Sequence, residues 1–292
     1  RQRQMCIRDR QGTTSLAKRG YRGNGISFFI VLTPVCKGEE DMIGYGMENK
    51  RGVISGGTSG IGLAAARMLV QDGATVWLVG RDPERGKKAL ESLEGLPGKA
   101  LYLQGDVSTV EGCRKIAACL QRQHQELDFL VNSAGIYQEK PFQDVTEEEY
   151  QQLMDVNVKG TIFLTQALLD LFAQDGPSIV NIASDAALEG NYGCCLYAAS
   201  KGAVVAFTRS LALDLAPWIR VNCLCPGDVD TPLVEKQLAE GGYSRESMAS
   251  VYPMGRIGKP EEVAHMICAV LSPLNGFMTG AIVSVDGGLT AK

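Results

Sequence analysis

The sequence predicts an α/β fold: a single doubly wound parallel sheet of about seven strands with helices on both faces. Beyond residue 50, short continuous apolar runs alternate with longer segments of helical period through to the C-terminus. Runs that are apolar at every position are typical of parallel strands buried on both faces, and the helical segments supply the cover. We find no repeat and no linker in this region, so the 292-residue chain is expected to hold one large domain.

The expected elements follow one another without a break. Residues 52–55 form the first strand, and the helix after it ends at Asp72-Gly73, a stop signal for helices. Further strands are expected at 74–79, 100–104, 127–132, 178–183 and 219–225. The segments between them predict helices at 82–93, 108–123 and 146–173, and a long helix that contains Tyr197.

The first 46 residues do not share this pattern. They show neither a helical nor a strand period, and their apolar run ISFFIVLTPVC is too short to span a bilayer. The opening RQRQMCIRDR resembles translated adapter sequence. We therefore expect residues 1–46 to be a non-native or disordered extension, with translation starting at Met42 or Met47, and residues 47–292 to be the functional domain.

Charge and composition exclude several classes of function. Residues 47–292 carry 21 Lys/Arg against 29 Asp/Glu, a net charge of −8, which argues against nucleic-acid binding. The nine cysteines are scattered and lack CxxC spacing, a pattern typical of reduced thiols in the cytoplasm. With only two histidines, His124 and His265, far apart in sequence, no metal site and no His-activated nucleophile are expected.

A glycine cluster, SGGTSGIG at 55–62, lies between the first strand and the first helix. In this context Gly56 permits a tight turn, Gly60 allows the backbone to approach a pyrophosphate, and Gly62 lets helix and strand pack closely. The N–H groups that begin the helix attract phosphate. The cluster therefore predicts a Rossmann-like dinucleotide site; the alternative is a glycine turn without a ligand.

The end of the second strand bears on which nicotinamide cofactor binds. An acidic residue there would bond the ribose 2′-hydroxyl, but this chain has Gly80 followed by Arg81. A guanidinium pairs with a 2′-phosphate, so we expect NADP(H), with NAD possible if Arg81 is only a solvated loop charge. Asp106, after the third strand, is placed to accept a hydrogen bond from the adenine amino group.

The motifs SGGTSGIG, GDV, NSAG, DVNV, IVNIAS, YAASK and PGDVDT occur here in the order and spacing of the short-chain dehydrogenase/reductase family. The resemblance covers about residues 50–288 and matches the single-domain oxidoreductase branch. One departure is visible, because NSAG carries Ser133 where the family usually has Asn. The resemblance implies a Rossmann-fold, NAD(P)-binding catalytic domain that interconverts a secondary alcohol and a ketone.

The resemblance also implies the catalytic residues. Tyr197 and Lys201 are four residues apart, so they share one helix face. A phenol has an unperturbed pKa of about 10, and a nearby cation favours the phenolate. Lys201 is thus expected to depress the pKa of Tyr197, the general acid/base, and to bond the nicotinamide ribose. Ser184 would orient the carbonyl, and Asn157 would hold a water in the proton relay; taken singly, each also has a purely structural explanation.

The cofactor contacts follow from the same motifs, and Val229 and Thr231 match positions where the family holds the nicotinamide carboxamide. The residues expected to contact the cofactor are Gly56, Thr58, Ser59, Gly60, Ile61, Gly62, Arg81, Asp106, Val107, Asn132, Ala134, Gly135, Tyr197, Lys201, Pro226, Gly227, Val229 and Thr231.

The segment from Pro232 to about Pro260 corresponds to the family's substrate lid and is rich in apolar residues. It favours an apolar, hydroxysteroid-like substrate, although packing of the lid on its own core explains these residues equally well. A 3-oxoacyl-[acyl-carrier-protein] reductase is the alternative. Such enzymes usually carry Lys or Arg where this chain has FAQDGP (172–177) and LALDL (211–215).

A non-catalytic nucleotide sensor is a remote alternative, because Tyr197 and Lys201 are both retained. The expected partners are a small-molecule substrate and further copies of the chain. The family's last strand, matched by MTGAIVSVDGG (278–288), commonly packs in a homotetramer, and a homodimer is also considered. No nucleic acid and no membrane is expected as a partner.

Overall fold

The structure is a computed structural model that describes residues 44–123, 125–240 and 242–291. Most of the extension predicted at 1–46, including Met42, lies outside these residues, so that prediction and the choice of start codon stay predictions. Among the described residues, no helix is long and apolar enough to cross a membrane.

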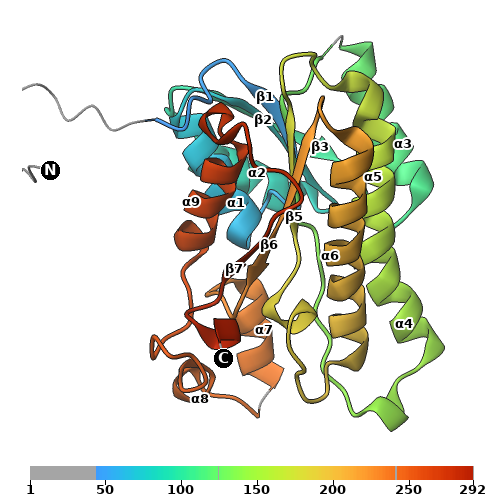
Figure 1. The fold of residues 1–292 in the computed structure, drawn as a ribbon, viewed down its shortest axis with the longest axis vertical. Helices are drawn as coiled ribbons and strands as arrows, with labels where there is room; N and C mark the ends of the chain where they lie inside the picture. Colours follow the sequence, from blue (N-terminus) through green and yellow to red (C-terminus); the bar gives the residue numbers. More distant parts are fainter. Residues whose placement is uncertain (1–43, 124, 241, 292) are drawn as a thin grey trace, which may run out of the picture. The chain divides into compact units, whose positions relative to one another are not determined.

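The fold is a seven-stranded, all-parallel sheet in the order β3-β2-β1-β4-β5-β6-β7, which confirms the predicted fold class (Figure 1). The chain builds β1, β2 and β3 outward, then crosses back to place β4 beside β1. In such sheets ligands bind beyond the carboxyl ends of the strands near this reversal. The strands are β1 (Arg51–Ser55), β2 (Thr75–Gly80), β3 (Lys99–Gln104), β4 (Phe129–Asn132), β5 (Ser178–Ile182), β6 (Arg220–Pro226) and β7 (Ile282–Val285).

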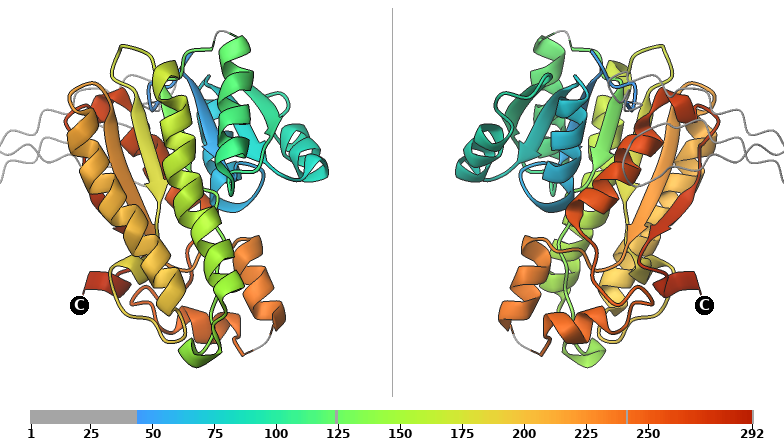
Figure 2. Two further views of the ribbon diagram at one scale, coloured as in Figure 1. Left: turned by 90° about the vertical axis from the view of Figure 1, so that its right-hand side faces the viewer. Right: turned by 90° about the vertical axis from the view of Figure 1, so that its left-hand side faces the viewer.

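Helices cover both faces of the sheet (Figure 2). Alternate residues of each strand point to opposite faces, so Ile54 packs into one core and Val53 into the other. The first core lies under α1 (Gly60–Gln71) and α9 (Pro260–Leu271), and the second under α3 (Val110–Arg122), α5 (Gly160–Leu168) and α6 (Cys195–Leu215). The remaining helices are α2 (Pro83–Ser92), α4 (Glu147–Met154), α7 (Pro232–Glu240) and α8 (Arg245–Ala249).

The helix predicted over 146–173 is not uniform. It consists of α4, a π-helical turn at Asp155–Lys159, α5 and a 3₁₀ turn at Leu169–Leu171. A π-helical turn widens the helix by one residue and is often found at functional sites. Helix α9 was not predicted from the sequence. The last strand is shorter than the predicted 278–288, because the glycines on either side of it, Gly280, Gly287 and Gly288, have positive φ.

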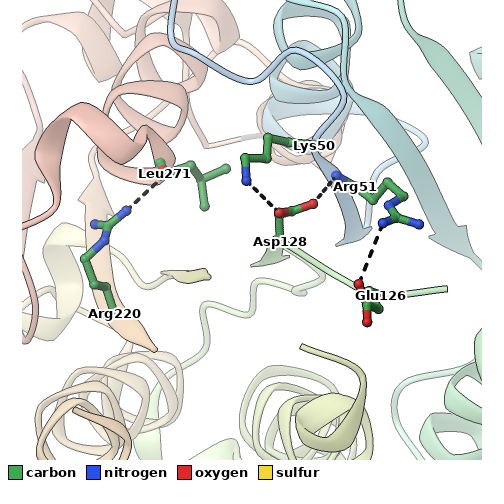
Figure 3. A network of polar contacts seen from close by, with 6 residues as sticks. All are labelled: Lys50, Arg51, Glu126, Asp128, Arg220 and Leu271. Carbon is green, nitrogen blue, oxygen red and sulfur yellow. Dashed lines mark hydrogen bonds and ion pairs between the residues drawn. The ribbon is translucent and has the colours of Figure 1, made fainter. Parts of the chain in front are cut away.

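Polar contacts fasten the strands at the end opposite their carboxyl termini (Figure 3). Asp128, just before β4, accepts a bond of 2.8 Å from Lys50 Nζ and another of 2.8 Å from the backbone N–H of Arg51. Arg220, at the start of β6, donates to Leu271 O at 3.0 Å and to Val270 O at 3.0 Å. It therefore satisfies carbonyls that the end of α9 leaves without helical partners.

Candidate active site

A cleft of about 930 Å³ lies at the carboxyl ends of the strands. The loops after β1, β2, β4, β5 and β6 line it, together with residues of α6, α7 and α8. Of the residues predicted to be catalytic or to bind cofactor, those in its wall are Gly56, Ser59, Gly60, Ile61, Arg81, Ala134, Gly135, Ser184, Tyr197, Lys201, Pro226, Gly227, Val229 and Thr231. Those outside its wall are Thr58, Gly62, Asp106, Val107, Asn132 and Asn157.

The turn between β1 and α1 requires its glycines. Gly56 and Gly60 have φ of +67° and +52°, a conformation that residues with a Cβ rarely adopt. A Cβ on Gly56 would lie 2.9 Å from the backbone of Ala134, and one on Gly62 would lie 2.5 Å from Gly56 O. A side chain at position 62 would therefore collide with the turn itself; the predicted role of Gly62 in packing the helix against the strand stays a prediction.

The same turn fits a phosphate group. Helix α1 begins at Gly60, its N-cap Ser59 makes no side-chain cap bond, and its first turn holds no acidic residue. The first N–H groups of a helix have no partner within the helix, and its N-terminal end carries partial positive charge. The residues here thus suit the pyrophosphate of a dinucleotide, which would lie against Ser59, Gly60 and Ile61.

Two arginines line the cleft beyond β2. Arg81 follows Gly80, the last residue of that strand, and is exposed. Arg85, which the sequence analysis missed, also lines the cleft, and its Nε lies 3.4 Å from Asp82 Oδ2. Asp106 lies outside the cleft wall and accepts a bond of 2.9 Å from the backbone N–H of Ser108.

The side chain of Asn132 hydrogen-bonds within the core of the fold and does not line the cleft. It is 2% exposed, and its Nδ2 donates to Thr165 Oγ1 at 2.9 Å and to Asn181 Oδ1 at 2.8 Å. These bonds hold the carboxyl end of β4 beside β5 and α5. Ser133, the departure from the family motif, lines the cleft, and its N–H donates to Ser55 O at 3.2 Å.

Asn157 lies in the π-helical turn and fastens the loop after β4. Its Oδ1 accepts from Ile136 N at 2.9 Å, and its Nδ2 donates to Ile136 O at 3.0 Å and to Ser200 Oγ at 3.1 Å. The side chain thus joins α4 and α5 to the cleft-lining loop and to α6. Its predicted role in holding a water stays a prediction.

Tyr197 and Lys201 lie on one face of α6 and are 8% and 6% exposed. Lys201 Nζ is 5.9 Å from the centre of the Tyr197 ring and donates to Ile182 O at 3.0 Å. Tyr137 packs edge-on against Tyr197, with ring centres 4.9 Å apart. The phenol, the ammonium group and Ser184 therefore share one part of the cleft wall.

Burial dominates the electrostatics of this pair. Burial raises the pKa of Tyr197, the Ser184 hydroxyl opposes this shift, and the charge of Asp185 adds to it. Burial also lowers the pKa of Lys201 to about 8. The prediction that the pKa of Tyr197 is lowered is therefore wrong in its net direction, because sequence spacing does not show how strongly the phenol is desolvated.

Ser184 caps the 3₁₀ turn at Asp185–Ala187 that follows β5. Its Oγ accepts from Ala186 N at 3.2 Å and donates to Asp185 Oδ1 at 2.7 Å. The orienting serine predicted from the sequence thus has a carboxylate partner, Asp185, that the sequence analysis did not identify.

The loop after β6 packs closely against the lid. A Cβ on Gly227 would lie 2.7 Å from the Tyr252 ring, and Asp228 N donates to Tyr252 Oη at 2.6 Å. Of the apolar and aromatic lid residues, Leu233, Val234, Tyr243, Met248, Val251 and Tyr252 line the cleft.

Acidic side chains lie among these lid residues. The acidic residues that line the cleft, none of which was predicted from the sequence, are Glu139, Asp185, Glu189 and Asp228. Glu139 accepts bonds from the hydroxyls of Tyr137 at 2.8 Å and Tyr243 at 2.5 Å. Single acidic residues in loops give no sequence signal, because only the folded arrangement brings them together. No cluster that could ligate a metal occurs in the described part of the chain.

Comparison with known proteins agrees with this geometry. A family model described as enoyl-(acyl carrier protein) reductase matches residues 56–290. The chain is 35% identical to 3-oxoacyl-[acyl-carrier-protein] reductase FabG of Chlamydia pneumoniae over 244 residues, 82% of this chain and 97% of that protein. It is 36% identical to the NADP-dependent (R)-specific alcohol dehydrogenase of Lentilactobacillus kefiri over 251 residues, 84% of this chain and 98% of that enzyme.

A solved structure extends the comparison to the fold. A short-chain dehydrogenase/reductase from Brucella melitensis, described as a glucose/ribitol dehydrogenase, superposes with a TM-score of 0.77 at 35% identity. The match covers 83% of this chain and 97% of that chain. The protein therefore belongs to the short-chain dehydrogenase/reductase family of NAD(P)-dependent oxidoreductases that act on alcohols and ketones.

Proposed function

We propose that the protein is an NADP(H)-dependent oxidoreductase that interconverts a free secondary alcohol and its ketone, with Tyr197 as general acid/base. The observation that carries this proposal is the position of Ser184, Tyr197 and Lys201 in one wall of the cleft that also holds the glycine turn. When bound, the nicotinamide cofactor supplies or accepts the hydride. The residues of the chain hydrogen-bond to the substrate's oxygen and transfer the proton to or from it.

The phenol of Tyr197 suits the role of proton donor in ketone reduction. Because burial raises its pKa, it keeps its proton at neutral pH and has one to give when charge develops on the substrate oxygen. Lys201, whose pKa is lowered to about 8, is still mainly protonated at pH 7 and stabilises the phenolate left behind. Its ammonium group also supplies donors for the ribose hydroxyls of the cofactor.

Arg81 and Arg85 support NADP(H) over NAD(H). Both line the cleft near the end of β2, where the adenosine ribose of a dinucleotide lies in this fold. A 2′-phosphate is a strong partner for guanidinium groups. The name of the Lentilactobacillus kefiri relative states NADP dependence, which agrees with this assignment.

We infer that the substrate is free and largely apolar, with a hydroxysteroid-like alcohol as the leading class. Leu233, Met248 and Val251 supply apolar cleft surface from α7, α8 and the segment after α8. Glu139, an exposed carboxylate in the wall of the cleft, would repel an acidic carrier protein. Similarity to 3-oxoacyl-[acyl-carrier-protein] reductases nevertheless keeps that activity as the second candidate.

A substrate panel tests the proposal. The purified full chain is mixed with NADPH or NADH and with an oxosteroid, cyclopentanone, an aldose, or a 3-oxoacyl thioester with and without its carrier, and nicotinamide absorbance is followed. We expect NADPH-dependent reduction of a free ketone. Preference for the carrier-bound thioester would select the second candidate, and NADPH binding without turnover on any substrate would favour a nucleotide sensor.

We also propose a cytoplasmic homotetramer or homodimer. Leu274 and Phe277 are exposed apolar side chains in the segment between α9 and β7, the edge strand of the sheet, and burial against another copy would remove them from water. Light scattering on the purified chain tests this part of the proposal, and a monomer at micromolar concentration would contradict it.

A further inference from the structure

The hydroxyl hydrogen of Ser184 points to Asp185. Ser184 Oγ donates to Asp185 Oδ1 at 2.7 Å, and the backbone N–H of Ala186 donates to the same carboxylate oxygen at 2.8 Å. The Ala186 N–H is also 3.2 Å from Ser184 Oγ, which accepts from it. Because a hydroxyl has one hydrogen, Ser184 cannot donate to Asp185 and, at the same time, to Tyr197 or to a bound substrate.

This arrangement does not suit the reduction of a ketone. A ketone oxygen only accepts hydrogen bonds, so an orienting serine has to turn its hydrogen toward the substrate. An ionised carboxylate binds a hydroxyl hydrogen about twice as strongly as a neutral acceptor does. The charge of Asp185 therefore decides whether the Ser184 hydrogen stays with the carboxylate or turns into the cleft.

The surroundings of Asp185 favour its neutral form. Asp185 is 7% exposed and lines the cleft, as does Ser184. Burial raises the pKa of Asp185, the bonds from Ser184 and Ala186 oppose this, and the charge of Asp286 raises it further. Although burial acts against the charge of Asp286, bonds from Thr290 and Gly288 hold its pKa below the ordinary range, so Asp286 remains anionic.

Other titratable groups face Asp185 from the elements packed against it. They come from α6 and its N-cap residue, from β6 and the loop after it, from the lid, and from the loop after β7. They are Cys194, Tyr197, Cys225, Asp228, Tyr252 and Asp286. Burial raises the pKa of Tyr197 and of Tyr252, so both phenols stay neutral in the range where an aspartic acid titrates.

We propose that Asp185 is a positioning residue that controls Ser184: ionised, it holds the serine hydrogen, and neutral, it releases that hydrogen to the oxygen of a bound ketone. The inference rests on the proposed function, because it assigns a direction to the hydrogen bond that Ser184 makes with substrate. Ketone reduction should accordingly be fast while Asp185 is protonated and slow once it is ionised.

The first test is the pH profile of kcat/KM for the ketone that the substrate panel identifies. In the unmodified protein we expect a fall of about tenfold per pH unit above the pKa of Asp185. Asp185→Asn keeps the shape of the side chain but is a neutral acceptor at every pH, so its kcat/KM should stay flat through that range. It should stay within about threefold of the unmodified protein's acidic plateau.

Asp228→Asn is the matched control, because Asp228 also lines the cleft, whereas the Ser184 hydroxyl donates to Asp185. It should keep the fall in kcat/KM and only displace its midpoint. The proposal would be overturned if kcat/KM of Asp185→Asn still fell with pH at the same midpoint, or if the fall disappeared in Asp228→Asn but not in Asp185→Asn.

A second test needs no turnover. The carboxyl carbons of aspartate, labelled with ¹³C, report the titration of Asp185 by NMR, and Asp185→Asn identifies its signal. Since the bond from Ser184 stabilises the ionised form, Ser184→Ala should shift this titration to higher pH. An unchanged titration would refute the coupling even if the protein reduced ketones. Absence of turnover on every substrate with the shift present would instead count against the proposed function alone.

Discussion

Lys201 Nζ lies 5.9 Å from the centre of the Tyr197 ring but directs a hydrogen bond of 3.0 Å to Ile182 O, at the end of β5. The ammonium group is therefore fastened to the sheet and faces the phenol without bonding to it. In the proposed reaction, a cation held in this way would already be in place when the phenol loses its proton, so no side chain would have to reorganise.

Removing the Tyr197 hydroxyl should separate chemistry from binding. Tyr197→Phe keeps the ring that packs on Tyr137 but has no proton to give, so we expect kcat to fall by about a thousandfold or more. The dissociation constant of NADPH, measured by fluorescence titration, should stay within about threefold. Retained turnover in this variant would remove Tyr197 from the proton-transfer step.

Arg81 should distinguish the two nicotinamide cofactors. Arg81→Ala removes a guanidinium from the part of the cleft where we propose that the adenosine binds, so NADPH should bind about 10- to 100-fold more weakly, while NADH binding should change little. Arg85→Ala is the comparison, and a smaller effect is expected because Arg85 lies 3.4 Å from Asp82 and is partly neutralised. Equal losses for NADPH and NADH in Arg81→Ala would contradict the assignment of NADP(H).

Lys201 should leave a signature in the pH dependence of stability. Its pKa falls from 10.5 to about 8 on folding, so between these values the unfolded chain binds more protons than the folded one. The free energy of unfolding should therefore rise as pH increases from 8 to 10.5, by at most on the order of 3 kcal/mol. Lys201→Met should lack this rise in urea unfolding curves recorded at pH 7, 9 and 10.

The same slope in both proteins would show that Lys201 is not desolvated as the structure indicates. Lys201→Met also leaves the carbonyl of Ile182 without its partner, which costs about 1–2 kcal/mol and lowers stability at every pH. The comparison therefore depends on the slope with pH and not on the absolute stability of the variant.

Parts of the site that lie close together in sequence were predictable. The glycines of the first turn and the spacing of Tyr197 and Lys201 have local physical causes, positive φ in a turn and one face of a helix. The fold class was predictable for the same kind of local reason, because strands of a parallel sheet buried on both faces are apolar at every position. Elements whose form depends on residues far away in the sequence were harder to predict. The π-helical turn occurs where Asn157 bonds to Ile136, and the hydrophobic periodicity of the sequence gives no sign of that contact.

The electrostatics of the site were not predictable from the sequence. Asp185 and Asp228 follow predicted residues by one position, yet nothing local indicates that both point into the cleft. The predicted direction of the Tyr197 pKa shift was wrong, because sequence spacing identifies the neighbouring cation but not how deeply the phenol is buried. Burial has the larger effect on this pKa. Desolvation belongs to the packed structure and has no sequence pattern.

Arg220 should be among the side chains most important for stability. It is 8% exposed and donates to Val270 O, Leu271 O, Ser272 O and Met278 O at 3.0–3.3 Å. Arg220→Met removes the guanidinium donor from the carbonyls at the end of α9, while Met278 O keeps a bond of 2.9 Å from Asn222 Nδ2. We therefore expect a loss of about 3 kcal/mol or more in the free energy of unfolding. Arg51→Met is the control, because its ion pair with Glu126 is exposed and 3.9 Å long, and it should cost under about 1 kcal/mol. Similar losses in the two variants would contradict this role for Arg220.

Gly56 and Gly95 separate backbone strain from close packing in the turn between β1 and α1. Both glycines have positive φ, +67° and +79°, so an alanine strains the backbone at either position by about 1 kcal/mol. A Cβ on Gly95 meets nothing within 4 Å, whereas one on Gly56 lies 2.9 Å from the backbone of Ala134. Gly56→Ala should therefore push apart the loops after β1 and β4, lose about 2–4 kcal/mol and weaken NADPH binding at least about tenfold. Gly95→Ala should lose only about 1 kcal/mol and bind NADPH normally. If both variants bound NADPH alike, the close approach at Gly56 would not be what shapes the turn between β1 and α1.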